Sequence, residues 1–455
     1  MKFEREKRMN RRTLLRHGAA AASFTLAWPF LEKNADAQAP SSSEVNKNSA
    51  PSQLKITDMR ACTVASNYDY PIIRIDTNQG ISGLGEVRDA GIKGLALVLK
   101  PHLVGRNPLQ IEPILDRIRR FAGHYRFGGG YSAIDMALHD IAGKVYGVPV
   151  WRLLGSKYRD KVRIYCDTPG SKDPAVFAER LKRRKAMGFT FFKMDLGTHL
   201  VADQSQAVND NGSATEKGLK LLCEYVAAVR EGIGYDAPLA ADHFGRLSVN
   251  DCIRYARAFE PYQLAWAEDF IPFQDWRGYQ TISEATTTPI LTGEDAFGLE
   301  EGFRDLIENH AVDIIHPDPE TAGGIRETKR IADYAAIHGI PTAIHFAGSP
   351  VGCMASVHAI ATIKNFIAME NHAVDIPWWS DLVTGIAKPI VNNGYIEVPE
   401  APGLGVELNE EVVKEHLREP GYFEPTPEYD HYILDDFRIR GPYPHLDEYG
   451  NPVNQ

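Results

Sequence analysis

Residues 238–294 decide the fold, because three apolar runs within them each end in a carboxylate. The runs are PLAAD (238–242), LAWAE (264–268) and PILTGE (289–294). Their last residues, Asp242, Glu268 and Glu294, follow one another at intervals of 26 residues. This interval fits one buried strand, one helix and two short loops, so the stretch predicts successive βα units of a parallel sheet.

Strands of the same kind lie on both sides of this stretch, with helical patterns such as 217–231 and 325–338 between most of them. The further candidates are 162–167 (VRIYCD), 190–195 (TFFKMD), 312–318 (VDIIHPD), 341–345 (PTAIH) and 366–370 (FIAME). Eight short strands, each followed by a helix or loop, predict a (β/α)8 TIM barrel. An open doubly wound sheet is the alternative, but no G-x-G-x-x-G follows a first strand.

A separate α+β unit precedes the barrel. ITDMRACTVAS (56–66) and PIIRIDTNQGISGLGEV (71–87) are β-rich, with a hairpin signal at Asn78-Gln79-Gly80. Helical patterns follow, so this unit is expected to cap the barrel. The expected division of the chain is 1–39 export signal, 40–53 linker, 54–160 α+β capping domain, 161–375 barrel, 376–419 return to the capping domain and 420–455 C-terminal tail.

Composition excludes several classes of protein. The chain has 50 Lys+Arg against 60 Asp+Glu, a net charge of −10, which argues against nucleic-acid binding. No apolar run of membrane-spanning length occurs in the body of the chain. The five cysteines are scattered without C-x-x-C spacing, so neither a disulfide framework nor a thiolate zinc site is expected. The expected partners are a small-molecule carboxylate, cations and copies of the same chain.

The N-terminus has the order of an export signal. Residues 2–16 are densely basic, residues 18–30 (GAAAASFTLAWPF) are mildly apolar and too short to span a bilayer, and Ala37-Gln38-Ala39 follows. The segment NRRTLLR (10–16) resembles the twin-arginine type of signal. We therefore expect a periplasmic protein. A basic tail without signal function, which would leave the protein in the cytoplasm, is the alternative.

The three carboxylates at 242, 268 and 294 predict a metal site. Barrel enzymes place their active sites at the carboxyl ends of the strands, so these side chains should lie side by side. The sequence shows no obvious basic partner for them, and three such charges would repel one another. A hard divalent cation resolves this, and Mg²⁺, one per chain with Mn²⁺ as a substitute, is the expected cofactor.

The remaining strand ends supply acid–base groups. The sixth strand ends in Asp318 and the seventh in His345, so the carboxylate is expected against one imidazole nitrogen, where it would fix the tautomer and raise the basicity. Lys193 and Asp195 are two residues apart on the second strand and share its inward face. Glu370 ends the eighth strand. All of these groups should line the mouth of the barrel.

Together these residues resemble the enolase superfamily, mandelate racemase subgroup, over about residues 54–415. The specific matches are Asp242, Glu268-Asp269, Gly293-Glu294, Pro317-Asp318, Gly323-Gly324-Ile325, His345 and the stretch PEAPGLGVEL (399–408). The resemblance implies that Asp242, Glu268 and Glu294 bind Mg²⁺ and that His345 with Asp318 is the general acid–base dyad. It further implies that Lys193 contacts the substrate carboxylate, as the first lysine of a Lys-x-Lys motif, and that Glu370 hydrogen-bonds the substrate carboxylate or enolate oxygen.

One departure from that family bears on the reaction. Asp195 stands where the racemases have a second lysine. Racemisation and epimerisation need a base on each face of the carbon, whereas β-elimination needs one base and an acid for the leaving hydroxide. The sequence therefore favours dehydration of an aldonate or aldarate to a 2-keto-3-deoxy acid. An epimerase, a lactone cycloisomerase and a non-catalytic sugar-acid binding protein are the alternatives.

Five further features are candidates for the site. His243 is a candidate acid, but strand alternation turns it away from Asp242 unless the chain kinks at Gly245. Arg126 and Tyr165 are candidate substrate contacts. The loop 66–70 is expected to close over the site, and the polar insertion 197–216 to shape the pocket or an oligomer contact.

Overall fold

The fold is known from a computed structural model, which describes residues 53–431. The expected export signal (1–39), nearly all of the linker and the end of the C-terminal tail lie outside the described residues. Within 53–431, no helix is both long enough and apolar enough to cross a membrane. The five cysteines are all free.

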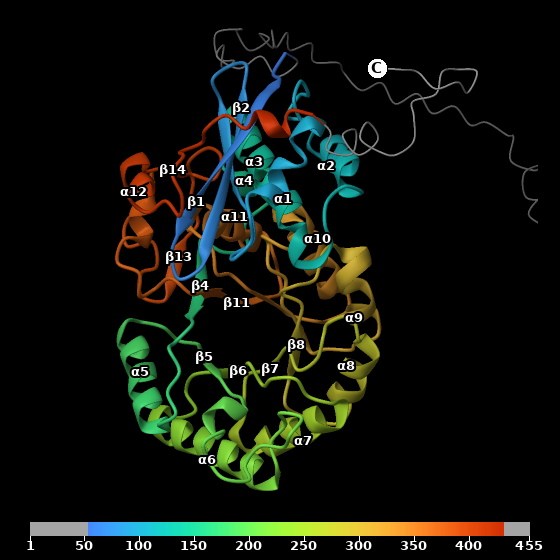
Figure 1. The fold of residues 1–455 in the computed structure, drawn as a ribbon, viewed down its shortest axis with the longest axis vertical. Helices are drawn as coiled ribbons and strands as arrows, with labels where there is room; N and C mark the ends of the chain where they lie inside the picture. Colours follow the sequence, from blue (N-terminus) through green and yellow to red (C-terminus); the bar gives the residue numbers. More distant parts are fainter. Residues whose placement is uncertain (1–52, 432–455) are drawn as a thin grey trace, which may run out of the picture. The chain divides into compact units, whose positions relative to one another are not determined.

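The capping domain consists of an antiparallel sheet and helices packed on it (Figure 1). Its three strands follow sequence order, and the β2–β3 turn contains the predicted hairpin residues, with Gly80 at a φ of 73°. The strands are β1 (Ile56–Ala65), β2 (Asp69–Thr77) and β3 (Ser82–Glu86), and the helices are α1 (Gly94–Leu97), α2 (Ile111–Arg119), α3 (Gly129–Tyr146) and α4 (Val150–Leu154). The α+β prediction for this segment is confirmed.

Helix α3 lies unusually close to strand β3 because two glycines leave room for it. A Cβ added at Gly83 would collide with the carbonyl oxygen of Ala137, and one at Gly85 with that of Ala133. The close approach buries almost the whole of α3, including both alanines.

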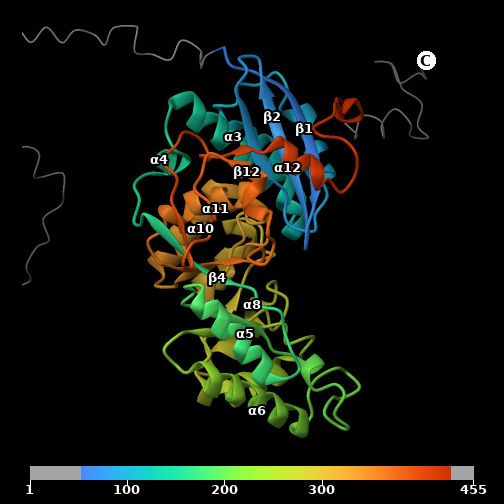
Figure 2. The same ribbon diagram turned by 90° about the vertical axis from the view of Figure 1, so that its left-hand side faces the viewer.

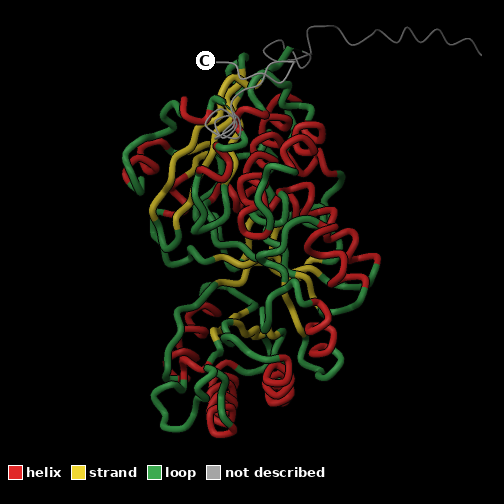
Figure 3. Tube along the Cα trace, turned by 45° about the vertical axis from the view of Figure 1, so that its right-hand side comes forward, coloured by secondary structure: helices red, strands yellow, loops and turns green. Residues whose placement is uncertain are grey.

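The second part of the chain is the predicted TIM barrel, in which strands alternate with helices (Figure 3). Its parallel strands follow sequence order, and the last pairs with the first to close the ring. The strands are β4 (Lys161–Cys166), β5 (Phe192–Asp195), β6 (Leu239–Asp242), β7 (Ala267–Glu268), β8 (Ile290–Thr292), β9 (Ile314–Ile315), β10 (Thr342–Ile344) and β11 (Phe366–Asn371). The helices are α5 (Pro174–Ala186), α6 (Glu216–Ile233), α7 (Val249–Phe259), α8 (Trp276–Ser283), α9 (Arg304–Glu308), α10 (Gly324–Ile337) and α11 (Pro350–Ala361).

Several strands are shorter than the apolar runs that predict them. The run 312–318 forms a strand only at Ile314–Ile315, partly because Pro317 has no N–H to donate to the ladder. The strands that carry the first two predicted metal ligands nevertheless end where expected, whereas others end one to three residues away from the expected position. Asp242 and Glu268 are the last residues of β6 and β7, and Glu294 lies two residues beyond β8.

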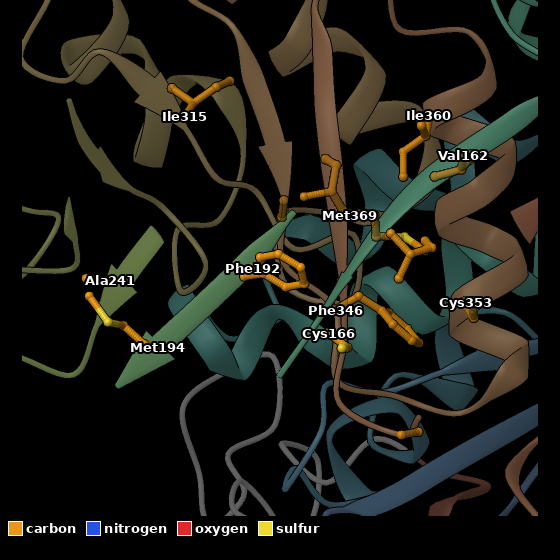
Figure 4. Packing of buried hydrophobic residues seen from close by; sticks show 14 of the residues in the cluster. Val162, Cys166, Phe192, Met194, Ala241, Ile315, Phe346, Cys353, Ile360 and Met369 are labelled. Carbon is orange, nitrogen blue, oxygen red and sulfur yellow. The ribbon is translucent and has the colours of Figure 1, made fainter. Parts of the chain in front are cut away.

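Alternate residues of the barrel strands pack on opposite sides of the ring, as strand geometry requires. Val162, Cys166, Phe192, Met194 and Met369 belong to the large core that includes residues of the surrounding helices (Figure 4). A second, smaller cluster contains one residue from each of the eight barrel strands or from the position directly before a strand. Its members are Tyr165, Phe191, Ala240, Trp266, Leu291, Ile314, Ala343 and Ala368. This cluster forms the apolar floor beneath the active site.

After the barrel the chain returns to the capping domain. It forms β12 (Val383–Thr384), β13 (Tyr395–Glu397), β14 (Glu407–Leu408) and α12 (Glu410–Glu415). Strand β13 pairs antiparallel with β4 of the barrel, and residues 416–418 then hydrogen-bond the end of β1 (Figure 2). Lys100 of the capping domain ion-pairs with Asp430 at 2.6 Å. Thus the beginning of the predicted tail packs on the capping domain.

Candidate active site

The carboxyl ends of the barrel strands surround a cavity of about 380 Å³. Asp242 and Glu294 line this cavity, and Glu268 lies fully buried beside them. Arg88 and Tyr68 of the capping domain line it from the other side. The cavity is therefore enclosed by both domains, as barrel active sites with capping domains are.

A lysine stands among the three predicted metal ligands, which the sequence argument did not anticipate. The Lys193 ammonium lies 3.0 Å from Asp242 Oδ2, 3.4 Å from Glu268 Oε1 and 2.7 Å from Glu370 Oε1. The expectation that the carboxylates have no basic partner is thus wrong. Lys193 points inward from β5 because it alternates with Met194, which packs outward.

The charges of the three carboxylates are only partly balanced. Burial and the neighbouring Glu268 raise the pKa of Asp242 to about 6. Burial also acts to raise the pKa of Glu268, but Lys193 and His316 outweigh it and hold this pKa below its ordinary value. For Glu294, His345 and Arg88 overcome the same effect of burial and lower the pKa. A carboxyl whose charge is disfavoured by a second carboxylate has capacity to bind a further cation.

The donor set fits a hard divalent cation. Asp242, Glu268 and Glu294 offer only carboxylate oxygens, the ligands that Mg²⁺ prefers, from three adjacent strand ends. Among the described residues, three groups have ligand atoms that all lie within 4.8 Å of one another; the triad Asp242, Glu268 and Glu294 is not one of them, and each of the three groups contains a histidine. These are His345, Glu370 and His372; Asp89, Asp318 and His345; and Glu268, His316 and Glu370. Their imidazole nitrogens suit Zn²⁺ better than Mg²⁺, and we assign them acid–base and structural contacts.

Asp318 and His345 form the expected pair. His345 Nδ1 lies 2.6 Å from Asp318 Oδ2, so the carboxylate holds the proton on Nδ1 and leaves Nε2 facing the cavity. Nε2 is 3.3 Å from Glu294 Oε2. Burial lowers the pKa of His345, but the charges of Glu294 and Asp318 more than compensate, and the pKa is raised. The geometry is that of a general base with an orienting carboxylate.

Arg88 is a functional residue that sequence reasoning missed. Its fully buried guanidinium donates to Asp318 Oδ2 at 2.8 Å and to Glu294 Oε1 at 3.2 Å, and it pairs with Asp89. Arg88 comes from the capping domain, two residues after β3. Arg88 therefore connects the capping domain with both the dyad and the predicted metal ligands. No local motif around position 88 indicates these contacts.

His243 faces the site, although strand alternation alone would turn it away. His243 itself adopts a φ of 60°, so the chain bends one residue after β6, and Gly245 bends it again with a φ of 91°. His243 Nδ1 lies 3.0 Å from Asp195 Oδ1 and 3.3 Å from Asp242 Oδ2. The hydrogen bond with Asp195 raises the pKa of His243 to about 9. Phe244 takes the buried position instead, and its ring centroid lies 4.4 Å from that of Phe270.

Tyr165 and Glu370 lie deeper in the barrel than expected. Both are fully buried and neither lines the cavity. The Tyr165 hydroxyl donates to Glu370 Oε2 at 3.1 Å and also lies 3.1 Å from His316 Nε2. The two residues are register partners on β4 and β11, one layer below the strand ends. Tyr165 is thus a support for Glu370 and not a substrate contact, because its side chain points into the barrel floor.

Arg126 lies at the edge of the site. Its guanidinium lies 3.1 Å from Asp295 Oδ1 and 3.5 Å from Glu294 Oε1, and its side chain is 41% exposed. It lines both the central cavity and an adjoining one of about 790 Å³, which is bounded on its outer side by Tyr125 and Phe273. The position is compatible with a contact to the distal end of a substrate.

Two loops differ in their relation to the cavity. The β1–β2 turn brings Tyr68 to the cavity wall, as expected of a covering loop. The insertion 197–216 contains a short 3-10 turn at Thr198–Leu200 and a bridge between Val208 and Ala214. No residue of this insertion, all of which is described, lines the central cavity. The expectation that it shapes the pocket is therefore not supported at this cavity.

Comparison with known proteins identifies the family. The family "Enolase C-terminal domain-like" matches residues 176–412, and "Mandelate racemase / muconate lactonizing enzyme, N-terminal domain" matches residues 43–155. The chain therefore belongs to the enolase superfamily, mandelate racemase subgroup. Within that superfamily it is an enzyme of the hydro-lyase class, since the relatives described next are dehydratases.

The relatives are similar over nearly their whole length. D-Xylonate dehydratase of Haloferax volcanii is 36% identical over 80% of this chain and 89% of its own. A D-mannonate dehydratase of Caulobacter vibrioides is 32% identical over 81% and 96%. Among solved structures, a mandelate racemase/muconate lactonizing enzyme-like protein from Rubrobacter xylanophilus has a TM-score of 0.75 at 32% identity, covering 82% of this chain and 99% of its own.

Proposed function

We propose that this protein dehydrates an acid sugar to a 2-keto-3-deoxy acid with Mg²⁺ as cofactor. The observation that carries the proposal is the pairing of His345 with Asp318 beside Glu294, a base directed at the predicted metal-ligand set. Support comes from the relatives, whose names include D-xylonate, D-mannonate and D-gluconate dehydratase. When bound by Asp242, Glu268 and Glu294, Mg²⁺ would stabilise the negative charge that develops on the substrate carboxylate.

The elimination needs a base and an acid, and two histidines of the cavity take these roles. His345 Nε2 takes the proton from the carbon next to the carboxylate, with Asp318 and Arg88 holding the imidazole in place. The electron pair first moves onto the carboxylate to give an enediolate, which can be reprotonated at C2, and then forms the C2–C3 double bond as the C3–O bond breaks. The leaving hydroxide accepts a proton from His243, which Asp195 orients, and departs as water. The resulting enol loses its O–H proton and takes up a proton at C3 to become the 2-keto acid.

The contacts of Lys193 weigh against the isomerase alternative. A racemase-type second base must lose its proton, whereas Lys193 is ion-paired with three carboxylates, which stabilise its charged form. Asp195, at the position of the second lysine in racemases, is instead the partner of His243. The cavity therefore holds one base, His345, and one candidate acid, His243, which are the two groups that elimination needs.

A panel of aldonic and aldaric acids tests the function. The purified enzyme with Mg²⁺ should convert at least one of D-xylonate, D-gluconate, D-galactonate and D-mannonate, or a related aldarate, to a 2-keto-3-deoxy product. Detection of the α-keto group by a carbonyl reagent gives the readout. A C2 epimer without keto product would establish the epimerase alternative. Binding without any α-proton exchange would establish a non-catalytic binding protein.

Replacement of His243 tests the acid. His243→Asn should lower kcat by ~10–10³, since a positioned general acid typically contributes on the order of 10²–10⁴ and water can replace it in part at this exposed position. Exchange of the substrate α-proton with solvent should survive, because His345 is intact. Steady-state kinetics and exchange followed by NMR measure the two effects. Loss of exchange together with turnover would show that His243 acts before the elimination step.

For the N-terminus we propose export by a twin-arginine-type signal. This proposal rests on the sequence alone, since Arg11 and Arg12 lie outside the described residues. Replacing both with Lys should leave the enzyme folded and active in the cytoplasm, because this type of signal requires the arginine pair. Cell fractionation with an activity assay measures the distribution. Unchanged periplasmic delivery would contradict the assignment.

A further inference from the structure

Two buried carboxyl groups that the reaction described above does not use lie beside the dyad. Glu86 is the last residue of β3 in the capping domain, and Glu320 lies in the loop between β9 and α10 of the barrel. Both side chains are fully buried. Glu320 follows Asp318 by two residues, so these carboxyl groups lie where the capping domain contacts the barrel.

Glu86 binds the N-terminus of α11. Its Oε1 accepts from the Ser349 N–H at 2.8 Å, and its Oε2 accepts from the Ser349 hydroxyl at 2.5 Å and from the Gly352 N–H at 2.9 Å. Ser349 is the N-cap of this helix. Because the unpaired N–H groups and the dipole of a helix N-terminus favour a negative charge, Glu86 is the group that holds the charge.

Glu320 packs against the same turn of α11, in a space that two glycines leave. A Cβ added at Gly352 would lie 1.9 Å from Glu320 Oε1 and 3.0 Å from Glu86 Oε2. One added at Gly348 would lie 2.2 Å from Glu320 Oε1 and 3.0 Å from Glu86 Oε1. The two carboxyl groups are therefore neighbours, and no other residue type fits at either glycine.

Glu320 lacks the donors that a buried carboxylate needs. Among residues 53–431, neither of its carboxyl oxygens has a hydrogen-bond partner. A carboxylate without donors beside a second carboxylate is strongly disfavoured in the interior. Burial and the charge of Glu86 raise the pKa of Glu320 well above its ordinary value. A protonated Glu320 has an O–H to donate, and Glu86 is the acceptor beside it.

The surroundings leave no cation to balance a second negative charge. The titratable and charged groups that face the pair are Cys62 of β1, Tyr70 of β2, Arg88 and Asp89 after β3, Asp318 of the barrel and Cys353 of α11. Of these groups only Arg88 is a cation. Its guanidinium is already paired with the carboxylates of Asp89, Glu294 and Asp318.

The pair bears on the base through the chain on either side of it. The Glu320 N–H donates to Asp318 Oδ1 at 2.6 Å. Two residues after Glu86, Arg88 donates to Asp318 Oδ2 at 2.8 Å. A hydrogen bond from Glu320 to Glu86 therefore holds together the two segments that orient Asp318, and with it His345.

We propose that Glu86 and Glu320 share one proton, and that this hydrogen bond keeps the capping domain in contact with the dyad until rising pH removes the proton. The effect on catalysis rests on the proposed function, whereas the shared proton does not. Glu320 is a positioning residue, since it acts on the base through Asp318. When the proton is lost, two like charges face each other in the interior and push the two segments apart.

Stability against pH tests the shared proton without any substrate. A glutamate of the unfolded chain ionises near a pKa of about 4.3, so above that pH the folded wild type binds one proton more than the unfolded chain, and stability falls as pH rises. Glu320→Gln keeps a neutral donor and lacks this proton. The unfolding constant of wild type relative to Glu320→Gln should therefore rise about tenfold per pH unit between about pH 5 and 7.

Unfolding by denaturant, followed by circular dichroism at each pH, gives this ratio. Glu320→Met, which is also neutral and of similar length, should show the same slope and guards against a folding defect in the amide variant. Glu231→Gln, at an exposed position on α6, is the matched control, and its ratio to wild type should not change with pH.

Exchange of the substrate α-proton tests the effect on the base. Exchange needs His345 but not the acid His243, so ionisation of the acid does not disturb it. In wild type the exchange rate should fall ~10–100-fold at the alkaline pH where the pair loses its proton, since a displaced catalytic group costs about this much. In Glu320→Gln the rate should stay level over the same range.

The outcomes separate this inference from the proposed function. If the ratio of unfolding constants is the same at every pH, Glu320 carries no extra proton, and the inference is wrong while the dehydratase proposal stands. If the slope is present but exchange has the same pH dependence in wild type and Glu320→Gln, the positioning role is refuted. If no acid of the panel undergoes exchange or dehydration, the proposed function fails, and the unfolding constants still decide whether the proton is shared.

Discussion

Glu268→Gln should abolish Mg²⁺ binding and turnover together. Glu268 is fully buried, accepts a hydrogen bond from Trp266 Nε1 at 2.8 Å and lies 3.1 Å from His316 Nδ1. Its carboxylate is therefore held in one orientation and cannot be replaced by a neighbouring side chain. The neutral amide leaves two carboxylates, which hold a dication poorly. Turnover should fall by at least ~10²–10³, the usual effect of removing one electrostatic contribution to a developing oxyanion.

Calorimetric titration with Mg²⁺ and steady-state kinetics give the two readouts for this variant. Glu231→Gln, an exposed position on α6, is the matched control and should behave as wild type. Wild-type activity that persists in EDTA, or unchanged Mg²⁺ affinity in Glu268→Gln, would overturn the metal assignment. Partial loss of activity with full metal binding would instead make Glu268 a positioning residue for Lys193.

His345→Asn should stop both α-proton exchange and product formation. The only nitrogen that Asp318 leaves facing the cavity is His345 Nε2, and Asn cannot accept a proton there. Loss of a general base typically costs ~10²–10⁴ in rate. Substrate binding should stay within about tenfold, since Lys193 and the metal ligands are unchanged. Exchange in D₂O, product assay and calorimetry separate these effects.

Asp318→Asn should do less damage than loss of His345, because Asp318 orients the imidazole and does not transfer the proton. Without the carboxylate, the pKa of His345 should fall, since Asp318 contributes to its raised value. The base is active when neutral, so the acidic limb of the pH–rate profile should move to lower pH. Turnover as low as that of His345→Asn would show that Asp318 does more than orient the base.

The order of the strands and the polar residues at or just beyond their ends could be predicted from the sequence, whereas the depth of each side chain within the barrel could not. Asp242, Glu268 and Asp318 each follow an apolar run, and that pattern is local. Tyr165 and Glu370 face inward as alternation predicts, but they lie one layer lower, in the floor. The layer depends on how neighbouring strands are staggered, and that register is a property of the closed ring.

Contacts between distant segments could not be predicted from the sequence either. Arg88 meets Asp318 across 230 residues of chain, and no spacing rule links the two. The lysine among the carboxylates was visible as an inward residue on β5, but its three partners became evident only in space.

The central claim is that one base acts on a carbon acid from which hydroxide then leaves. Incubation of the Mg²⁺-loaded enzyme in D₂O with the sugar acid that it accepts, followed by ¹H NMR, tests this most directly. The predicted result is a 2-keto-3-deoxy acid that carries deuterium at C3, with recovered substrate of a single configuration at C2. Recovered substrate that contains its C2 epimer, deuterated at C2 and formed without keto product, would contradict the account.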